Sequence, residues 1–254
     1  MVDEYIVCVG KSEDNTLELV KSIKSNKIKI IETVWNEENL RGGGELAVQA
    51  NITLSHCSGD WAFYLQPDEV IHEDDLPIIQ SAFKKYFNNH QILAFAFYFL
   101  HFTGDYWTLN PWDFHKEVRI IRNKGELIVG GDSGQIMRKS DGVHFGRKFF
   151  GKEIIILNAR IFHYGWVKKP EVVRTKIEEQ RKLWFGKGEF SIKERKGREQ
   201  VWSYYEKLDI LKPFNGTHPK VMEERVKNFP KVRKKNRWLV FDFYKEMFKR
   251  GFRG

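Results

Sequence analysis

Apolar residues alternate between short continuous runs and helical spacing through the N-terminal third of the chain. Continuous runs predict strands at residues 5–9 and 61–65, and alternation of apolar and polar residues predicts another at 27–33. Segments with helical spacing separate them, at 17–23 and 46–57. Asp14 or Asn15 is available to cap the first of these helices. This order of elements is typical of consecutive βαβ units.

The middle of the chain adds one more helix and further strands. Asp74, Asp75 and Pro77 predict the start of a helix. Strand-like runs follow at 92–100, 118–121 and 154–157. From residue 170 the spacing becomes helical, without another long strand-like run. We therefore expect a Rossmann-like α/β domain over 1–169, with a mixed sheet flanked by helices, and a helical, basic extension over 170–254.

Charge is concentrated in that extension. The 254 residues carry a formal net charge of +9, but residues 216–254 alone hold 12 Lys or Arg against 4 Asp or Glu. The nearly neutral remainder does not favour nucleic acid as a partner. Cys8 and Cys57 indicate no disulfide framework. No apolar run approaches the roughly 20 residues that span a membrane, and we expect a cytoplasmic protein.

Asp68 and Glu69 follow the predicted strand at 61–65. In an open α/β sheet, ligands bind beyond the carboxyl ends of the strands. Two adjacent carboxylates at such a place can hold Mg2+ or Mn2+, which in turn bridges the phosphates of a nucleotide. The alternative is structural, because acidic residues after strands commonly form turns.

Arg41 precedes three consecutive glycines at 42–44 and the predicted helix after them. This arrangement could present a cation and backbone N–H groups to the phosphates of a donor. The glycines are equally compatible with a tight loop and no ligand.

Four segments of the chain resemble family-two glycosyltransferases. Residues 59–69, which read Gly-Asp-Trp-Ala-Phe-Tyr-Leu-Gln-Pro-Asp-Glu, resemble the strand that leads into the family's Asp-x-Asp metal motif. Residues 10–20 resemble its turn into a helix, and residues 119–123 and 162–167 resemble features of a bacterial branch. The resemblance implies the GT-A fold. It also implies metal-assisted, inverting transfer of a sugar from a nucleotide-diphosphate donor to a glycan, lipid or other hydroxyl acceptor.

The sequence departs from the family pattern at two places. Gln66 stands where the metal motif begins with Asp, so Asp68 is the acidic position that matches. Val9 and Gly10 stand where the family commonly has acidic residues that hold the nucleoside. Polar side chains that could take over this donor contact are Ser12, Glu13 and Asp14.

The resemblance also suggests a base and a further metal ligand. Asp132, in the glycine-rich segment 130–134, lies where the family places the base that deprotonates the acceptor; Asp105 and Asp113 are rivals. Asp132 as a simple turn residue is the alternative. His163 would join Asp68 and Glu69 at the metal, as a late histidine does in some members of the fold. A partly buried structural histidine among aromatic residues is the alternative.

The end of the chain combines cations with an apolar stripe. Basic residues between 231 and 237 precede apolar positions at helical spacing from 238 to 248. A basic amphipathic helix can lie on an anionic surface, which would place the protein at the inner face of a membrane, near a lipid-linked acceptor. Alternatively, the apolar stripe packs on the α/β domain.

The resemblance finally predicts a gap in the sheet. In the family, a strand and a helix precede the strand represented here by residues 5–9, and that first strand lies inside the sheet. Unpaired backbone groups on both sides would be costly unless another segment fills the gap. We expect an upstream segment or a second copy to complete the sheet, and weak donor binding without it. A non-catalytic relative that binds nucleotide or glycan in the same cleft is the second hypothesis.

Overall fold

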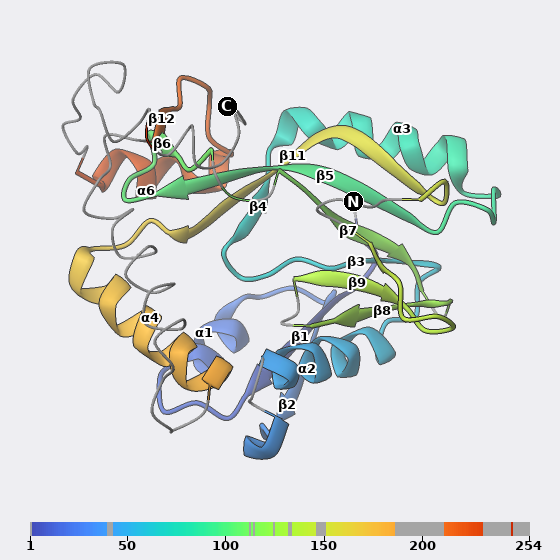
Figure 1. Ribbon diagram of the computed structural model, residues 1–254, viewed down its shortest axis with the longest axis horizontal. Helices are drawn as coiled ribbons and strands as arrows, with labels where there is room; N and C mark the ends of the chain where they lie inside the picture. The colour runs from blue at the N-terminus through green and yellow to red at the C-terminus, as the bar shows by residue number, and fades with distance from the viewer. Residues whose placement is uncertain are drawn as a thin grey trace.

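The described part of the chain folds into three sheets with helices packed around them (Figure 1). The computed structural model describes residues 2–39, 43–111, 113, 115–123, 125–131, 134–145, 151–185, 211–230 and 245. Within these residues there is a seven-stranded mixed sheet, a three-stranded antiparallel sheet and a two-stranded parallel sheet. Helix α3 lies over one side of the large sheet, and α2 lies with the two small sheets on the other side.

The large sheet is built around the long strand β5. Its strands run in the order β3 (Trp61–Phe63), β7 (Lys116–Arg122), β5 (Ala94–Thr103), β11 (Ile154–Trp166) and β4 (Glu69–Ile71). β5 and β11 are parallel, and the other pairs among these five strands are antiparallel. The end of β5 continues into β6 (Thr108–Leu109), which pairs with β12 (Lys212–Pro213).

Strand β5 supplies both faces of the core through its alternating side chains. Phe95 and Phe97 are fully buried and pack toward α3 (Leu76–Tyr86), which follows the short helix η3 (Glu73–Asp75). Ala94 and Ala96 face the opposite layer, where small side chains leave room for α2 and the three-stranded sheet. The mixed sheet flanked by helices is therefore present as predicted.

The opposite layer contains α2 (Gly44–Ser55) and a small antiparallel sheet. The strands of this sheet are β8 (Leu127–Gly130), β9 (Gln135–Arg138) and β10 (His144–Phe145). The Asn51 amide on α2 donates to the Val129 carbonyl and accepts from the Val129 N–H. One side chain thus satisfies the backbone of β8 as a neighbouring strand would.

The N-terminal strands form a sheet of their own. β1 (Tyr5–Gly10) and β2 (Ile28–Thr33) pair in parallel and are connected through α1 (Thr16–Ser22). The short helix η1 (Glu37–Asn39) follows β2. Among the described residues, neither strand pairs with the large sheet. The Glu4 carboxylate accepts from the Ser58 N–H and hydroxyl, which ties the start of β1 to the segment before β3. The strand expected to fill this discontinuity stays a prediction.

In its described residues, the predicted C-terminal extension is helical only in part. It contains α4 (Pro170–Phe185), η5 (Lys220–Met222) and α6 (Glu223–Asn228), but also strand β12. Residues 211–230 dock on an aromatic cluster at the end of β5 and β11, which includes Phe102, Tyr106 and Phe162. This segment therefore packs against the end of the large sheet.

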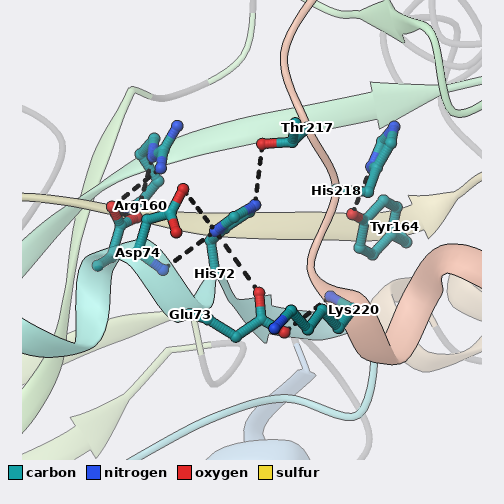
Figure 2. A network of polar contacts seen from close by, with 9 residues as sticks. His72, Glu73, Asp74, Arg160, Tyr164, Thr217, His218 and Lys220 are labelled. Atoms are coloured by element: carbon teal, nitrogen blue, oxygen red, sulfur yellow. Dashed lines mark hydrogen bonds and ion pairs between the residues drawn. The ribbon is translucent and has the colours of Figure 1, made fainter.

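Polar contacts reinforce that docking (Figure 2). The Tyr164 hydroxyl lies 2.8 Å from His218 Nδ1, and Thr217 Oγ1 lies 3.1 Å from His72 Nε2. The Lys220 N–H donates to the Glu73 carboxylate. Burial lowers the pKa of His218, which favours its neutral ring beside the tyrosine.

A helix both long enough and apolar enough to cross a bilayer is not found among the described residues. The basic amphipathic helix predicted beyond residue 231 lies outside them, apart from Lys245.

Candidate functional site

A turn between β3 and β4 carries Asp68 at the edge of the large sheet. The Glu69 N–H donates to the Gln66 carbonyl, which closes the turn, and the Asp68 carbonyl accepts from the Tyr164 N–H at 2.8 Å. β4 then pairs with β11, so that Glu69 is opposite His163. The backbone thus holds Asp68 beside the carboxyl end of β11, where ligands bind in open α/β sheets.

His163 on β11 is the first neighbour of the Asp68 carboxylate. Its Nε2 lies 3.7 Å from Asp68 Oδ2. Its Nδ1 lies 2.9 Å from Nδ1 of His101, the residue beside it on β5. One ring must donate this hydrogen bond and the other accept it, so His101 fixes the orientation of the His163 ring.

Lys176 on α4 is the second neighbour. Its Nζ lies 3.6 Å from Asp68 Oδ2 and donates to the Gly165 carbonyl at 2.9 Å. The ammonium also lies 4.8 Å from the centre of the Trp166 ring. Burial lowers the pKa of Lys176, and the Asp68 carboxylate opposes that shift.

The cluster of Asp68, His163 and Lys176 is partly accessible. Their side chains are 33%, 14% and 24% exposed, respectively. Burial by itself would raise the pKa of Asp68, but interactions with His163 and Lys176 outweigh it and lower this pKa to about 2. Asp68 is therefore an anion at neutral pH, held against two cationic or hydrogen-bonding side chains.

Glu69 lies in a different environment from its neighbour in the sequence. Arg119 on β7 donates to both of its carboxylate oxygens, from Nε at 2.8 Å and from Nη2 at 2.7 Å. Both side chains are almost completely buried. Burial alone would lower the pKa of Arg119, but Glu69 outweighs this effect and raises it. Glu69 thus anchors the turn that presents Asp68, which differs from the metal- and donor-binding roles predicted for it.

Gly165 leaves space for the cluster. A Cβ atom at this position would lie 2.7 Å from His163 Nε2 and closer still to Asp68 Oδ2. The site therefore depends on the absence of a side chain between Tyr164 and Trp166.

The predicted donor-binding residues of the N-terminal segment form a local turn. The Ser12 hydroxyl donates to Asp14, and the Asp14 carboxylate accepts from the Thr16 N–H at the start of α1. These hydrogen bonds lower the pKa of Asp14. At the end of β1, a Cβ on Gly10 would meet the Trp35 indole, so this ring covers the position where the family commonly has an acidic residue.

The remaining predicted residues are only partly placed. Asp132 and Arg41 lie outside the described residues. The carbonyl of Gly134, which ends the connection from β8 to β9, lies 3.5 Å from Arg119 Nη1, close to the Glu69 ion pair. Asp105, a rival base, is buried and accepts from the Trp107 N–H and the Thr108 hydroxyl.

Two residues at this site, Lys176 and His101, were not predicted from the sequence. Lys176 is one cation among several on α4, although it falls next to the apolar face marked by Val173 and Ile177. That spacing could have singled out a cation turned toward the domain. His101 lies in an otherwise apolar strand, where a histidine that is 2% exposed indicates a polar partner.

The residues around Asp68 fit a divalent metal poorly. Mg2+ and Mn2+ prefer oxygen ligands, which at nucleotide sites are one or two carboxylates together with phosphates and water. Here one carboxylate and one imidazole lie beside an ammonium, and Glu69 is held by Arg119. In the described part of the chain, no three His, Cys, Asp or Glu side chains are grouped as metal ligands.

Comparison with known proteins gives a family match that includes part of this site. The chain matches Glycosyl transferase family 2 over residues 1–145, more than half of its length. The match contains Asp68, Glu69 and Arg119 and ends before His163 and Lys176. No curated protein matches the chain. Members of the family act on nucleotide sugars, have the GT-A fold and typically use a divalent metal at an Asp-x-Asp motif. The chain belongs to glycosyl transferase family 2 and is a glycosyltransferase.

Proposed function

We propose that this enzyme transfers a sugar, with inversion, from a nucleotide-diphosphate donor to a hydroxyl group of a glycan or lipid-linked acceptor. The observation that carries the proposal is the partly exposed cluster of Asp68, His163 and Lys176 at the carboxyl end of β11. It combines charges that can orient a diphosphate with a position where ligands of α/β sheets bind. The family match covers the turn that holds Asp68.

The reaction needs a base for the acceptor and stabilisation for the leaving group. Asp132 remains the proposed base, and it falls in the connection from β8 to β9 whose last residue, Gly134, contacts Arg119. Donor contacts from Ser12, Asp14 and Arg41 also remain proposals. The typical use of a divalent metal in the family supports the Mn2+ or Mg2+ predicted at Asp68. The side chains that surround this carboxylate argue against it.

A donor screen tests the function. Purified protein is incubated with a panel of nucleotide sugars and simple hydroxyl acceptors, and release of nucleoside diphosphate is measured with and without MnCl2. We expect at least one donor to be turned over, and Asp68→Asn to slow turnover on the order of 100-fold because it releases Lys176 and His163. Asp60→Asn is the matched control, since Asp60 is an exposed aspartate just before β3. Equal rates for Asp68→Asn and the wild type would exclude this site.

A further inference from the structure

We propose that the ammonium of Lys176 performs the task that a divalent metal performs elsewhere in the family, so that this enzyme binds and activates its donor without a metal. The inference rests on the proposed function, because it assigns the diphosphate of the donor to the Asp68 cluster. It differs from the sequence prediction, which placed Mn2+ or Mg2+ at Asp68.

The position of Lys176 is fixed by three groups, one on the turn before β4 and two on β11. The Asp68 carboxylate lies 3.6 Å away on the turn before β4, and the Gly165 carbonyl accepts from Nζ at 2.9 Å. The Trp166 ring lies 4.8 Å from Nζ, within the range of a cation–π contact. The side chain is nevertheless 24% exposed, so an anion can approach the ammonium from solvent.

The same neighbours exclude a competing metal. A divalent ion bound to Asp68 would lie next to the Lys176 ammonium, and the two positive charges would repel each other in a half-buried setting. Glu69 is committed elsewhere, since Arg119 binds both of its oxygens. His163 has only Nε2 to offer, because its Nδ1 is bonded to His101. Gln66 supplies no negative charge at the first position of the motif.

The chemistry of transfer requires a cation at the leaving group. The acceptor oxygen forms a bond to the anomeric carbon, and the bond from that carbon to the phosphate oxygen breaks with its electron pair on the oxygen. The acceptor proton passes to the base, proposed above as Asp132. Lys176 donates a hydrogen bond to the diphosphate as this negative charge develops and keeps its own proton, so that it is unchanged after the reaction.

Calorimetry distinguishes nucleotide binding that depends on Lys176 from binding that depends on a metal. Binding of uridine, guanosine and thymidine diphosphates to the wild type is measured in EDTA and in MnCl2. We expect the best of these nucleotides to bind in EDTA with an affinity within about twofold of that in MnCl2, because Lys176 already supplies the cation. Binding that disappears in EDTA and returns with MnCl2 would overturn the inference and leave the transferase function intact. No binding of any nucleotide, together with no turnover in the donor screen, would overturn the function itself.

Variants of Lys176 give a second readout. In EDTA, Lys176→Met should weaken nucleotide binding about tenfold or more, and Lys176→Arg should retain part of it. Lys168→Met is the matched control, because Lys168 is an exposed cation on the approach to α4. Thermal unfolding shows whether each variant is folded. If Lys176→Met does not fold, the comparison of wild-type nucleotide binding in EDTA and in MnCl2 still tests the proposal.

Loss of the ammonium should also create a metal site. Mn2+ alone, followed by electron paramagnetic resonance without nucleotide, should bind Lys176→Met about tenfold more tightly than the wild type, since Asp68 is then free of its cation. Adding Asp68→Asn to that variant should abolish the gain. Tighter Mn2+ binding by the wild type than by Lys176→Met would contradict the proposal.

Discussion

Asp68 and Glu69 are adjacent carboxylates with opposite surroundings, and this difference decides their roles. Asp68 faces the partly exposed Lys176 ammonium, whereas Glu69 points inward to Arg119. The Arg119 guanidinium also lies over the Phe99 ring, 4.8 Å from its centre. The ion pair is thus enclosed by apolar surface, where each charge depends on the other.

Removing one member of this pair should be costly. Arg119→Met leaves the buried Glu69 carboxylate without its cation, and we expect a loss of about 3–5 kcal/mol in the free energy of unfolding. Urea titration of the single variants and of the double variant Glu69→Gln/Arg119→Met measures the effect, and the double variant should lose less than the sum of the two. Lys21→Met, which breaks the exposed pair with Glu32, should change stability by less than about 1 kcal/mol. Similar losses in both pairs would argue against burial as the cause.

The sequence was sufficient to predict that Asp68 lies in a turn after a strand. It was not sufficient to predict the partner of Glu69. The turn after the strand at 61–65 is visible in the sequence, but Arg119 is 50 residues away. Lys176 is still farther along the chain, and only the pairing of β11 with β4 and β5 brings its helix to the turn. Side-chain partners set by tertiary contacts leave no local pattern in the sequence.

Among the elements, strands with long apolar runs were predicted well and short ones were missed. The predicted runs at 5–9, 27–33 and 61–65 correspond to β1, β2 and β3. The strands β8, β9 and β10 have two to four residues, too few for a periodicity, and were not predicted. Strand β3 is equally short but was predicted from the five-residue run at 61–65. The predicted strand at 154–157 is the start of β11, which continues through register shifts to Trp166.

The docked segment 211–230 provides a test at the scale of an element. Met222 is 7% exposed and packs in the aromatic cluster, whereas the adjacent Val221 is 73% exposed. Met222→Ala should lower the free energy of unfolding by about 2–5 kcal/mol through a cavity. Val221→Ala should stay within about 0.5 kcal/mol of the wild type. Chemical unfolding followed by tryptophan fluorescence measures both, and equal effects would show that the segment does not pack as described.

At the scale of the molecule, the separate N-terminal sheet should be the least stable part of the described structure. It has two strands, and α1 has no buried residues. Leu19 on that helix and Ile23 just after it are 66% and 58% exposed. Two-stranded sheets are marginal without further packing.

Hydrogen exchange can test this ranking. Amides of β1 and β2 should exchange on the order of 100-fold faster than those of β5 and β11, after correction for intrinsic rates, because local opening of the small sheet breaks few buried contacts. Mass spectrometry of peptides from both sheets gives the comparison. Equal protection would mean that the two sheets open together, and it would also argue against a gap between them.

The close packing at Gly165 has a consequence for genetic variants at this position. Any glycine codon becomes an alanine codon by one base change, and a methyl group here would displace the ends of Asp68 and His163 without striking backbone. Gly165→Ala should therefore change the free energy of unfolding by about 1 kcal/mol or less while removing most transferase activity. A library of alleles scored for both abundance and activity should find alanine at this position accepted by the first measure and rejected by the second. Alanine at the fully buried Phe162 should lower both abundance and activity. Alanine at position 165 should instead give alleles whose protein accumulates in folded form but is inactive.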